Sequence, residues 1–130
     1  MCMQLVMDPS KYDVILTENL YGDILSDLCA GLIGGLGFVP SANLGEDSAI
    51  FEAVHGTAPD IAGKGLANPS AILMSACMLL DHIGQREVAD KIRAALQILY
   101  SNPSTFTKDV KGPLDTKAYT AKMIELVSAQ

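Results

Sequence analysis

Residues 12–37 place a short apolar run, a polar helix start and a glycine-rich apolar segment directly after one another. Val14–Leu16 form a continuous apolar run that suits a buried strand, and residues 28–37 carry no charged side chain. Between them lie Asp23 and Asp27, at the start of a helical pattern. We therefore expect a strand-loop-helix unit of an α/β protein, with both aspartates at its mouth, where ligand crevices of such proteins form.

Asp23 and Asp27 are four residues apart, so on a helix they lie one above the other on the same face. Two carboxylates held this close repel each other unless a positive charge sits between them. A divalent cation such as Mg²⁺ or Mn²⁺ prefers oxygen ligands and would fill this role. The alternative is a solvated acidic helix start, which the helix dipole also favours.

A second polar segment follows a predicted strand at residues 50–54. Pro59 and Gly63 interrupt any helix there, which indicates a loop. Glycine lets a backbone amide approach a ligand, and loop amides can hold a phosphate. A surface turn with a locally satisfied histidine is the alternative. Neither common glycine-rich nucleotide fingerprint is present. The polar and flexible positions of this loop are His55, Gly56, Thr57 and Asp60.

Together these segments resemble the isocitrate/isopropylmalate dehydrogenase family of metal-dependent oxidative decarboxylases. The resemblance is close from residue 1 to about residue 84 and includes residues 19–27, the turn at 34–37, and residues 55–63 followed by Asn68-Pro69. Residues 29–35 look most like NAD-dependent isocitrate dehydrogenases. Homoisocitrate and 3-isopropylmalate dehydrogenases remain alternatives.

The resemblance assigns roles to single residues. It implies that Asp23 and Asp27 bind Mg²⁺ or Mn²⁺. An acid at Asp60 implies NAD rather than NADP, because it repels a 2′-phosphate. Asp8 fits the same choice, since some NADP-using relatives carry an arginine there. The positions that match cofactor contacts in the family are Glu52, His55, Gly56, Thr57, Ala58, Asp60, Ile61 and Asn68.

The implied reaction is the oxidative decarboxylation of isocitrate to 2-oxoglutarate with NAD, and the substrate class is a 2-hydroxy di- or tricarboxylic acid. The family's substrate-clamping arginines and its proton-transfer tyrosine and lysine have no match here. We therefore expect residues 1–130 to form a single partial domain, the C-terminal portion of a longer enzyme, with no catalytic residue of its own. A non-catalytic subunit is the alternative. We expect the chain to form a homo-oligomer or to associate with the missing N-terminal half.

Composition excludes several other classes. A net charge of −6 and a sequence pI near 4.6 disfavour nucleic acid as a partner. No membrane span or signal peptide is predicted, so we expect a cytoplasmic protein, or a mitochondrial-matrix protein in a eukaryote. Cys2, Cys29 and Cys77 lie far apart in apolar settings and are expected to be buried free thiols. A mean hydropathy of +0.27 suggests that apolar area is covered by another domain or subunit.

The rest of the chain is expected to be scaffold. Helical periodicity predicts helices over residues 69–83, 85–100 and 116–127, with Asn68 capping the first and Gly84 ending it. Ile72, Leu73, Ala76, Leu79 and Leu80 are expected to face the core. We expect two to four strands in a mixed sheet flanked by three or four helices. Residues 110–113 depart from the family's Leu-Gly-Gly turn, which leaves the cofactor contacts of this tail open.

Overall fold

Helices make up most of the chain, and one pair of strands completes an α/β fold. The computed structural model describes residues 1–130. Short 3₁₀ turns connect several elements, among them η2 (Leu36–Phe38), η3 (Pro59–Ile61) and η5 (Lys108–Val110). The helices and strands are α1 (Cys2–Met7), α2 (Asn19–Ile33), β1 (Pro40–Leu44), β2 (Ala49–Ala53), α3 (Ser70–His82), α4 (Arg86–Tyr100) and α5 (Thr116–Ser128). The fifth helix, beyond the expected number, is α1.

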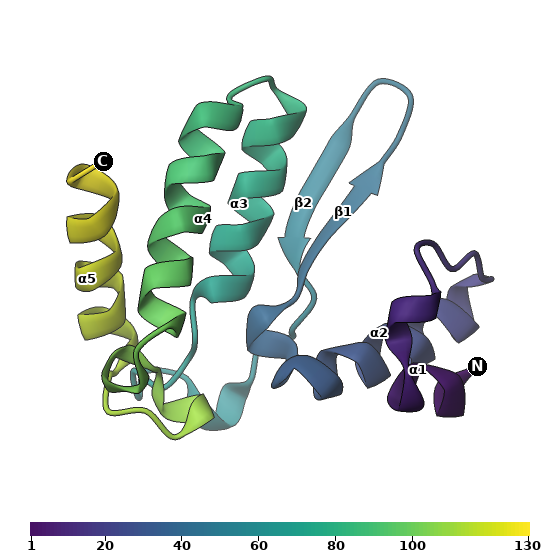
Figure 1. The fold of residues 1–130 in the computed structure, drawn as a ribbon, viewed down its shortest axis with the longest axis horizontal. Helices are drawn as coiled ribbons and strands as arrows, with labels where there is room; N and C mark the ends of the chain where they lie inside the picture. Colours follow the sequence, from purple (N-terminus) through teal and green to yellow (C-terminus); the bar gives the residue numbers. More distant parts are fainter.

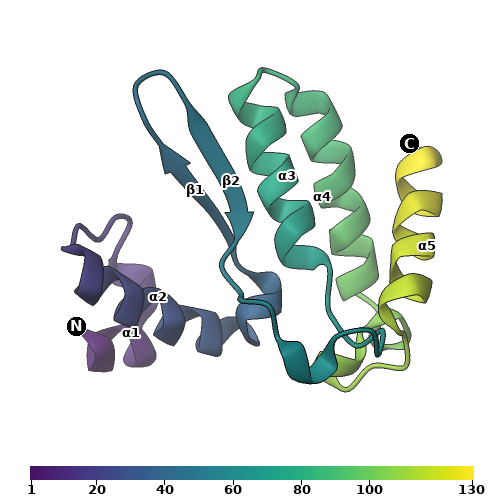
Figure 2. The same cartoon turned by 180° about the vertical axis from the view of Figure 1, so that it is seen from behind.

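The elements form a row that ends in an extended arm. Helices α3, α4 and α5 lie side by side, and the β1–β2 hairpin leans against α3 on the other side (Figure 1). Helices α1 and α2 reach away from this body, as the reverse view also shows (Figure 2). The loop after β2 runs beneath the helical row to the start of α3, and it passes the segment that leads into α5. Two segments far apart in sequence therefore meet at this end of the molecule.

The core lies between α4 and α5. Leu96 and Leu99 of α4 and Tyr119 and Met123 of α5 are buried together, because both helices are apolar on the facing side. The prediction for α3 is wrong in part. The side of α3 that packs on the hairpin and α4 buries the small residues Ala71, Ser75 and Cys77. Ile72 and Leu79 remain 51% and 42% exposed. Small residues allow a close approach of neighbouring elements, so they occupy the contact that the larger residues were expected to fill.

The strands form an antiparallel hairpin whose register runs from Pro40 opposite Ala53 to Leu44 opposite Ala49. The hairpin is attached to α3 by a hydrogen bond of 2.8 Å from Ser75 Oγ to the carbonyl oxygen of Glu52. Phe51 packs on the ring of His82 with centroids 5.4 Å apart. The strand predicted at residues 50–54 is confirmed as β2, which begins and ends one residue earlier than predicted.

Helix boundaries follow the predicted signals. Asn68 Oδ1 accepts a hydrogen bond of 3.0 Å from the backbone amide of Ser70, the first residue of α3. After α3 the chain turns at Gly84, whose φ of +78° is open to glycine at little cost. The helices predicted at 85–100 and 116–127 are confirmed as α4 and α5.

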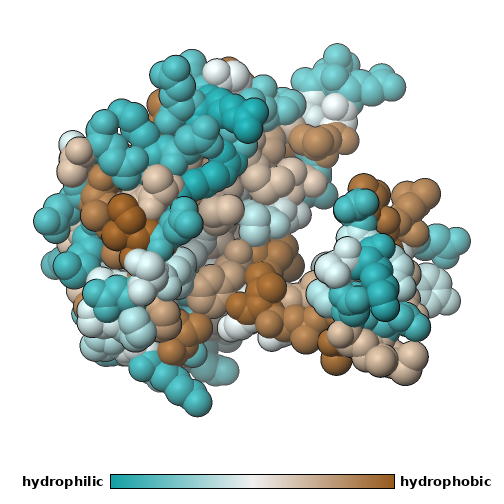
Figure 3. Space-filling model, in the orientation of Figure 1, coloured by the Kyte–Doolittle hydropathy of each residue, from teal (hydrophilic) through white to brown (hydrophobic).

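The strand predicted at Val14–Leu16 is wrong. These residues form an irregular segment with no strand partner, and Val14 and Leu16 are 87% and 96% exposed. The helix that follows, α2, is also largely open: Leu20, Ile24 and Ile33 are each at least half exposed, and only Ala30 is buried. Figure 3 shows hydrophobic atoms along the arm that joins the helical body to the N-terminal end. The aspartates therefore lie on an exposed helix rather than at the mouth of a buried unit.

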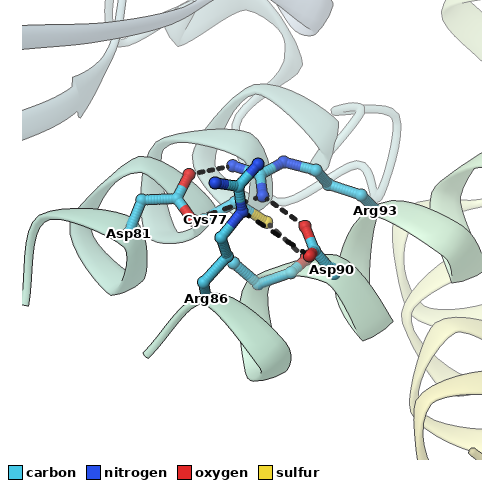
Figure 4. Close-up of polar contacts among 6 residues, drawn as sticks. Cys77, Asp81, Arg86, Asp90 and Arg93 are labelled. Carbon is cyan, nitrogen blue, oxygen red and sulfur yellow. Dashed lines mark hydrogen bonds and ion pairs between the residues drawn. The ribbon is translucent and has the colours of Figure 1, made fainter. Parts of the chain in front are cut away.

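An ion-pair cluster fastens α3 to α4. Arg93 on α4 contacts Asp81 on α3, and its Nη1 lies 2.9 Å from Asp90 Oδ1 (Figure 4). Beneath it, Cys77 Sγ donates to the carbonyl oxygen of Ala89, and burial raises the pKa of this thiol. Cys77 is buried as predicted, but the prediction is wrong for Cys2, which is exposed. None of the helices combines the length and the apolar character needed to cross a bilayer.

Candidate functional site

A cavity of about 610 Å³ opens where the loop after β2 meets the segment between α4 and α5. Its walls come from η2, from the loop over residues 55–68 and from two residues of the C-terminal segment, Asp109 and Thr116. Apolar atoms dominate the surface, with a few polar groups among them, as is typical of small-molecule sites. This cavity is the candidate ligand site.

The loop that lines the cavity contains a strained residue. Ala58 has φ +41° and ψ +61°, the left-handed region, which costs a non-glycine residue on the order of 1–2 kcal/mol. It also precedes Pro59, which normally favours an extended conformation for the residue before it. Such strain persists where surrounding structure demands it and is frequent at ligand sites. The turn at Ala58 starts η3 and brings Ile61 to the cavity wall.

The polar wall of the cavity is an amide–carboxylate pair. Asn68 Nδ2 donates a hydrogen bond of 3.1 Å to Asp109 Oδ2, and Asn68 is only 6% exposed. Gly37 packs against this pair, because a Cβ at its position would lie 3.2 Å from Asn68 Cβ and 3.4 Å from Asp109 Oδ2. The pair joins the start of α3 to η5, with η2 packed against it, and the Asp109 carboxylate offers the cavity an acceptor-only group.

His55 begins the loop with its ring directed to the backbone of the next residue, Gly56. Its Nδ1 lies 3.1 Å from the carbonyl oxygen of Gly56. A carbonyl oxygen only accepts hydrogen bonds, so Nδ1 carries a proton in this contact. The hydroxyl of Thr57 makes no hydrogen bond within the chain, so it remains free for a ligand.

The structure brings most of the predicted cofactor residues together. Two predicted residues do not line the cavity. Glu52 lies on β2, where its Oε1 accepts a hydrogen bond of 3.0 Å from Asn43 Nδ2. Asp60 is exposed on η3, beside the cavity-lining Ile61. The predicted residues that do line the cavity are His55, Gly56, Thr57, Ala58, Ile61 and Asn68.

Asp109 and Thr116 were not predicted as site residues. Thr116 ties the start of α5 to the loop through a hydrogen bond of 2.9 Å from its amide to the carbonyl oxygen of Gly65. Its hydroxyl also donates to the carbonyl oxygen of Ala67. The tail therefore closes on the loop despite the altered turn at residues 110–113. Asn68 and Asp109 are separated by 41 residues, so only long-range contacts reveal the pair.

The predicted metal pair lies apart from this cavity. Asp23 and Asp27 sit one turn apart on α2, both exposed, and neither carboxylate has a hydrogen-bond or ion-pair partner. No group of three or more metal-ligating side chains exists in the chain. Two free carboxylates fit Mg²⁺ or Mn²⁺ as part of a donor set, because these ions bind through one or two carboxylates and keep other oxygen ligands.

Comparisons with known proteins show similar sequences and a similar fold. The isocitrate/homoisocitrate dehydrogenase of Thermus thermophilus is 50% identical over 127 residues, which cover 98% of this chain and 38% of that protein. The human mitochondrial NAD isocitrate dehydrogenase subunit alpha is 52% identical over 127 residues, covering 97% of this chain and 35% of that protein. The crystal structure of isocitrate dehydrogenase from Methylococcus capsulatus superposes with a TM-score of 0.93 at 48% identity, covering 97% of this chain and 38% of that chain.

The chain thus spans little more than a third of the length of these relatives. The sequence pattern of one family matches residues 1–127 of the 130. Fold, identity and matched range point the same way, and the chain belongs to the isocitrate/isopropylmalate dehydrogenase family.

Proposed function

We propose that this chain is the cofactor-loop and metal-binding portion of an NAD-dependent oxidative decarboxylase that converts isocitrate to 2-oxoglutarate. The observation that carries the proposal is the cavity of about 610 Å³ that unites the strained loop at Ala58 with Asn68 and Asp109. The name of the human relative, an NAD isocitrate dehydrogenase subunit, supports both the cofactor and the substrate.

In this proposal the loop over residues 55–61 holds the adenosine and phosphates of NAD. The backbone around Gly56 approaches the phosphates, and the Thr57 hydroxyl is free to donate to them. Asp60 lies beside the cavity on η3, where its charge disfavours a 2′-phosphate. Glu52 lies on the hairpin, away from the cavity lining, and we assign it a position near the nicotinamide.

Asp23 and Asp27 would hold Mg²⁺ or Mn²⁺ together with oxygen ligands from other sources. The bound ion supplies a Lewis acid for the decarboxylation. We assign no proton-transfer residue to this chain, so its residues bind and orient rather than carry out the chemistry. The exposed apolar residues of α2 support an assembly in which another subunit or domain covers this helix.

Isothermal titration of the purified chain with NAD and with NADP tests the cofactor assignment. We expect weak binding of NAD and weaker binding of NADP. Without binding of either nucleotide, the proposal fails. Steady reduction of NAD by the isolated chain, with isocitrate and Mn²⁺ present, would contradict the absence of catalytic residues.

Manganese titration followed by electron paramagnetic resonance tests the metal pair. The double variant Asp23→Asn/Asp27→Asn is expected to weaken Mn²⁺ binding and leave NAD binding to the distant cavity unchanged. The matched control is Asp13→Asn, since Asp13 is an exposed aspartate outside α2. Equal Mn²⁺ affinity in the double variant and the control would contradict a metal-binding role for Asp23 and Asp27.

The related substrates homoisocitrate and 3-isopropylmalate are the second candidate class. The name of the Thermus thermophilus relative, isocitrate/homoisocitrate dehydrogenase, and the family description favour keeping them. A third candidate is a non-catalytic subunit of the same fold. The carboxylate pair Asp23 and Asp27 argues against a non-catalytic subunit. Failure of the wild-type chain to bind Mn²⁺ would favour it.

A further inference from the structure

A continuous hydrogen-bonded chain runs from the core between α4 and α5 to the wall of the cavity. It starts at the hydroxyl of Tyr119, which lies 3.0 Å from Ser70 Oγ. Ser70 Oγ lies 2.5 Å from the hydroxyl of Tyr100, which donates at 3.3 Å to Asn68 Oδ1. Asn68 Nδ2 then donates to Asp109 at 3.1 Å. Tyr119, Ser70 and Asn68 are at most 6% exposed, so little water reaches the inner bonds, whereas Tyr100 is half-buried and Asp109 at the outer end is exposed.

The hydrogen bonds of this series all point one way, from Tyr119 to Asp109. The Asp109 carboxylate only accepts, so the Asn68 amide must present its nitrogen to Asp109 and its oxygen to Tyr100. Tyr100 uses its one proton on Asn68 and therefore accepts from Ser70, which in turn accepts from Tyr119. Burial raises the pKa of Tyr119, so its hydroxyl keeps the proton that it donates. Hydrogen bonds aligned in this way polarise one another toward the carboxylate.

Asn68 has no alternative orientation that satisfies these partners. Its Oδ1 also accepts from the backbone amide of Ser70 at 3.0 Å. A flipped amide would place an N–H against that amide and an oxygen against the Asp109 carboxylate. The flip would therefore lose both good contacts and create two repulsive ones, and it would also lose the hydrogen bond from Tyr100 to the amide oxygen.

We propose that Tyr100 is a positioning residue for the cavity: through Asn68 it holds the Asp109 carboxylate ready to accept a hydrogen bond from a ligand. The inference rests on the proposed function, in which that ligand is the adenosine part of NAD. Tyr100 reaches Asn68 from the end of α4 but is not among the residues that line the cavity. Ser70 and Tyr119 continue the series of hydrogen bonds from Tyr100 to α5.

The test compares Tyr100→Phe with Tyr12→Phe, a matched loss of a tyrosine hydroxyl that makes no hydrogen bond in the chain. Titration with NAD and with 5′-AMP measures the dissociation constants. Tyr100→Phe is expected to weaken both by roughly three- to tenfold, the effect of one net hydrogen bond. Nuclear magnetic resonance of the Asn68 side-chain amide is expected to show a shift in Tyr100→Phe and none in Tyr12→Phe.

Equal affinities in the two variants, with NAD binding intact in the wild type, would overturn the inference and leave the proposed function standing. An unchanged Asn68 amide signal in Tyr100→Phe would also overturn it. If the wild-type chain binds neither nucleotide, both the inference and the proposed function fail.

A second variant covers the case in which Tyr100→Phe does not fold. Ser70→Ala removes only the hydroxyl that joins Tyr119 to Tyr100 and keeps the backbone amide that Asn68 caps. It is expected to weaken 5′-AMP binding about threefold. Affinity equal to that of Tyr12→Phe would overturn the inference in this variant as well.

Discussion

Replacing Gly112 with alanine is expected to break the turn that closes the C-terminal segment. A Cβ at this position would lie within 3.0 Å of the carbonyl oxygen and carbonyl carbon of Phe106, closer than real Cβ contacts come. These are backbone atoms, so no side-chain rotation can relieve the overlap. The turn around Phe106 must move.

That movement strains or breaks several contacts. The Gly112 amide donates to Thr107 at 2.9 Å, and the Leu114 amide donates to Phe106 at 3.1 Å. Each is worth about 1 kcal/mol, and overpacking adds about 1–3 kcal/mol. The free energy of unfolding should therefore fall by about 3–5 kcal/mol. For a chain of this length that corresponds to a decrease in Tm of roughly 11–18 °C.

Thermal and urea unfolding followed by circular dichroism measure this loss. The matched control is Gly31→Ala, since Gly31 is an exposed residue within α2 where a Cβ meets nothing within 4 Å. The control should gain about 0.5–1 kcal/mol from the better helix propensity of alanine. A Tm for Gly112→Ala within about 2 °C of wild type would refute the steric reasoning.

Four further predictions concern other parts of the chain. Lys111→Gly should raise the free energy of unfolding by about 0.5–1 kcal/mol in urea titrations, because Lys111 has φ +63° and lysine is costly there. The hydrogen bond from Arg93 lowers the pKa of Asp81 from its usual value, so this pair stabilises the fold above that usual pKa and loses its effect as the pH falls through the lowered pKa. Urea midpoints of wild type and Asp81→Asn should therefore differ at neutral pH and converge in acid. Mass spectrometry after maleimide treatment should show Cys77 unmodified until the chain unfolds, because burial raises its pKa and blocks access. Asp60→Lys should shift the ratio of NADP to NAD affinity toward NADP by about tenfold or more, and an unchanged ratio would remove Asp60 from cofactor selection.

Local signals explain why most helices could be predicted. Helix α4 has one apolar side and polar residues elsewhere, and α3 has a capping Asn68 before it and Gly84 after it. These interactions act within a few residues, so a single sequence reveals them. The spacing of Asp23 and Asp27 is likewise a local property of one helix. The contacts of the loop after β2 with the rest of the chain are not local, so they could not be predicted in this way.

The sequence by itself thus determined the limits of α3, α4 and α5, the carboxylate spacing and the loop that carries His55. Only the tertiary structure decided that residues 14–16 are not a strand, because a strand exists only when a second segment supplies its hydrogen bonds. It also decided that Asp109 faces the loop from 41 residues beyond Asn68, and that Tyr100 and Ser70 connect that pair to the core. Such contacts depend on how distant segments pack in three dimensions, and no local pattern encodes them.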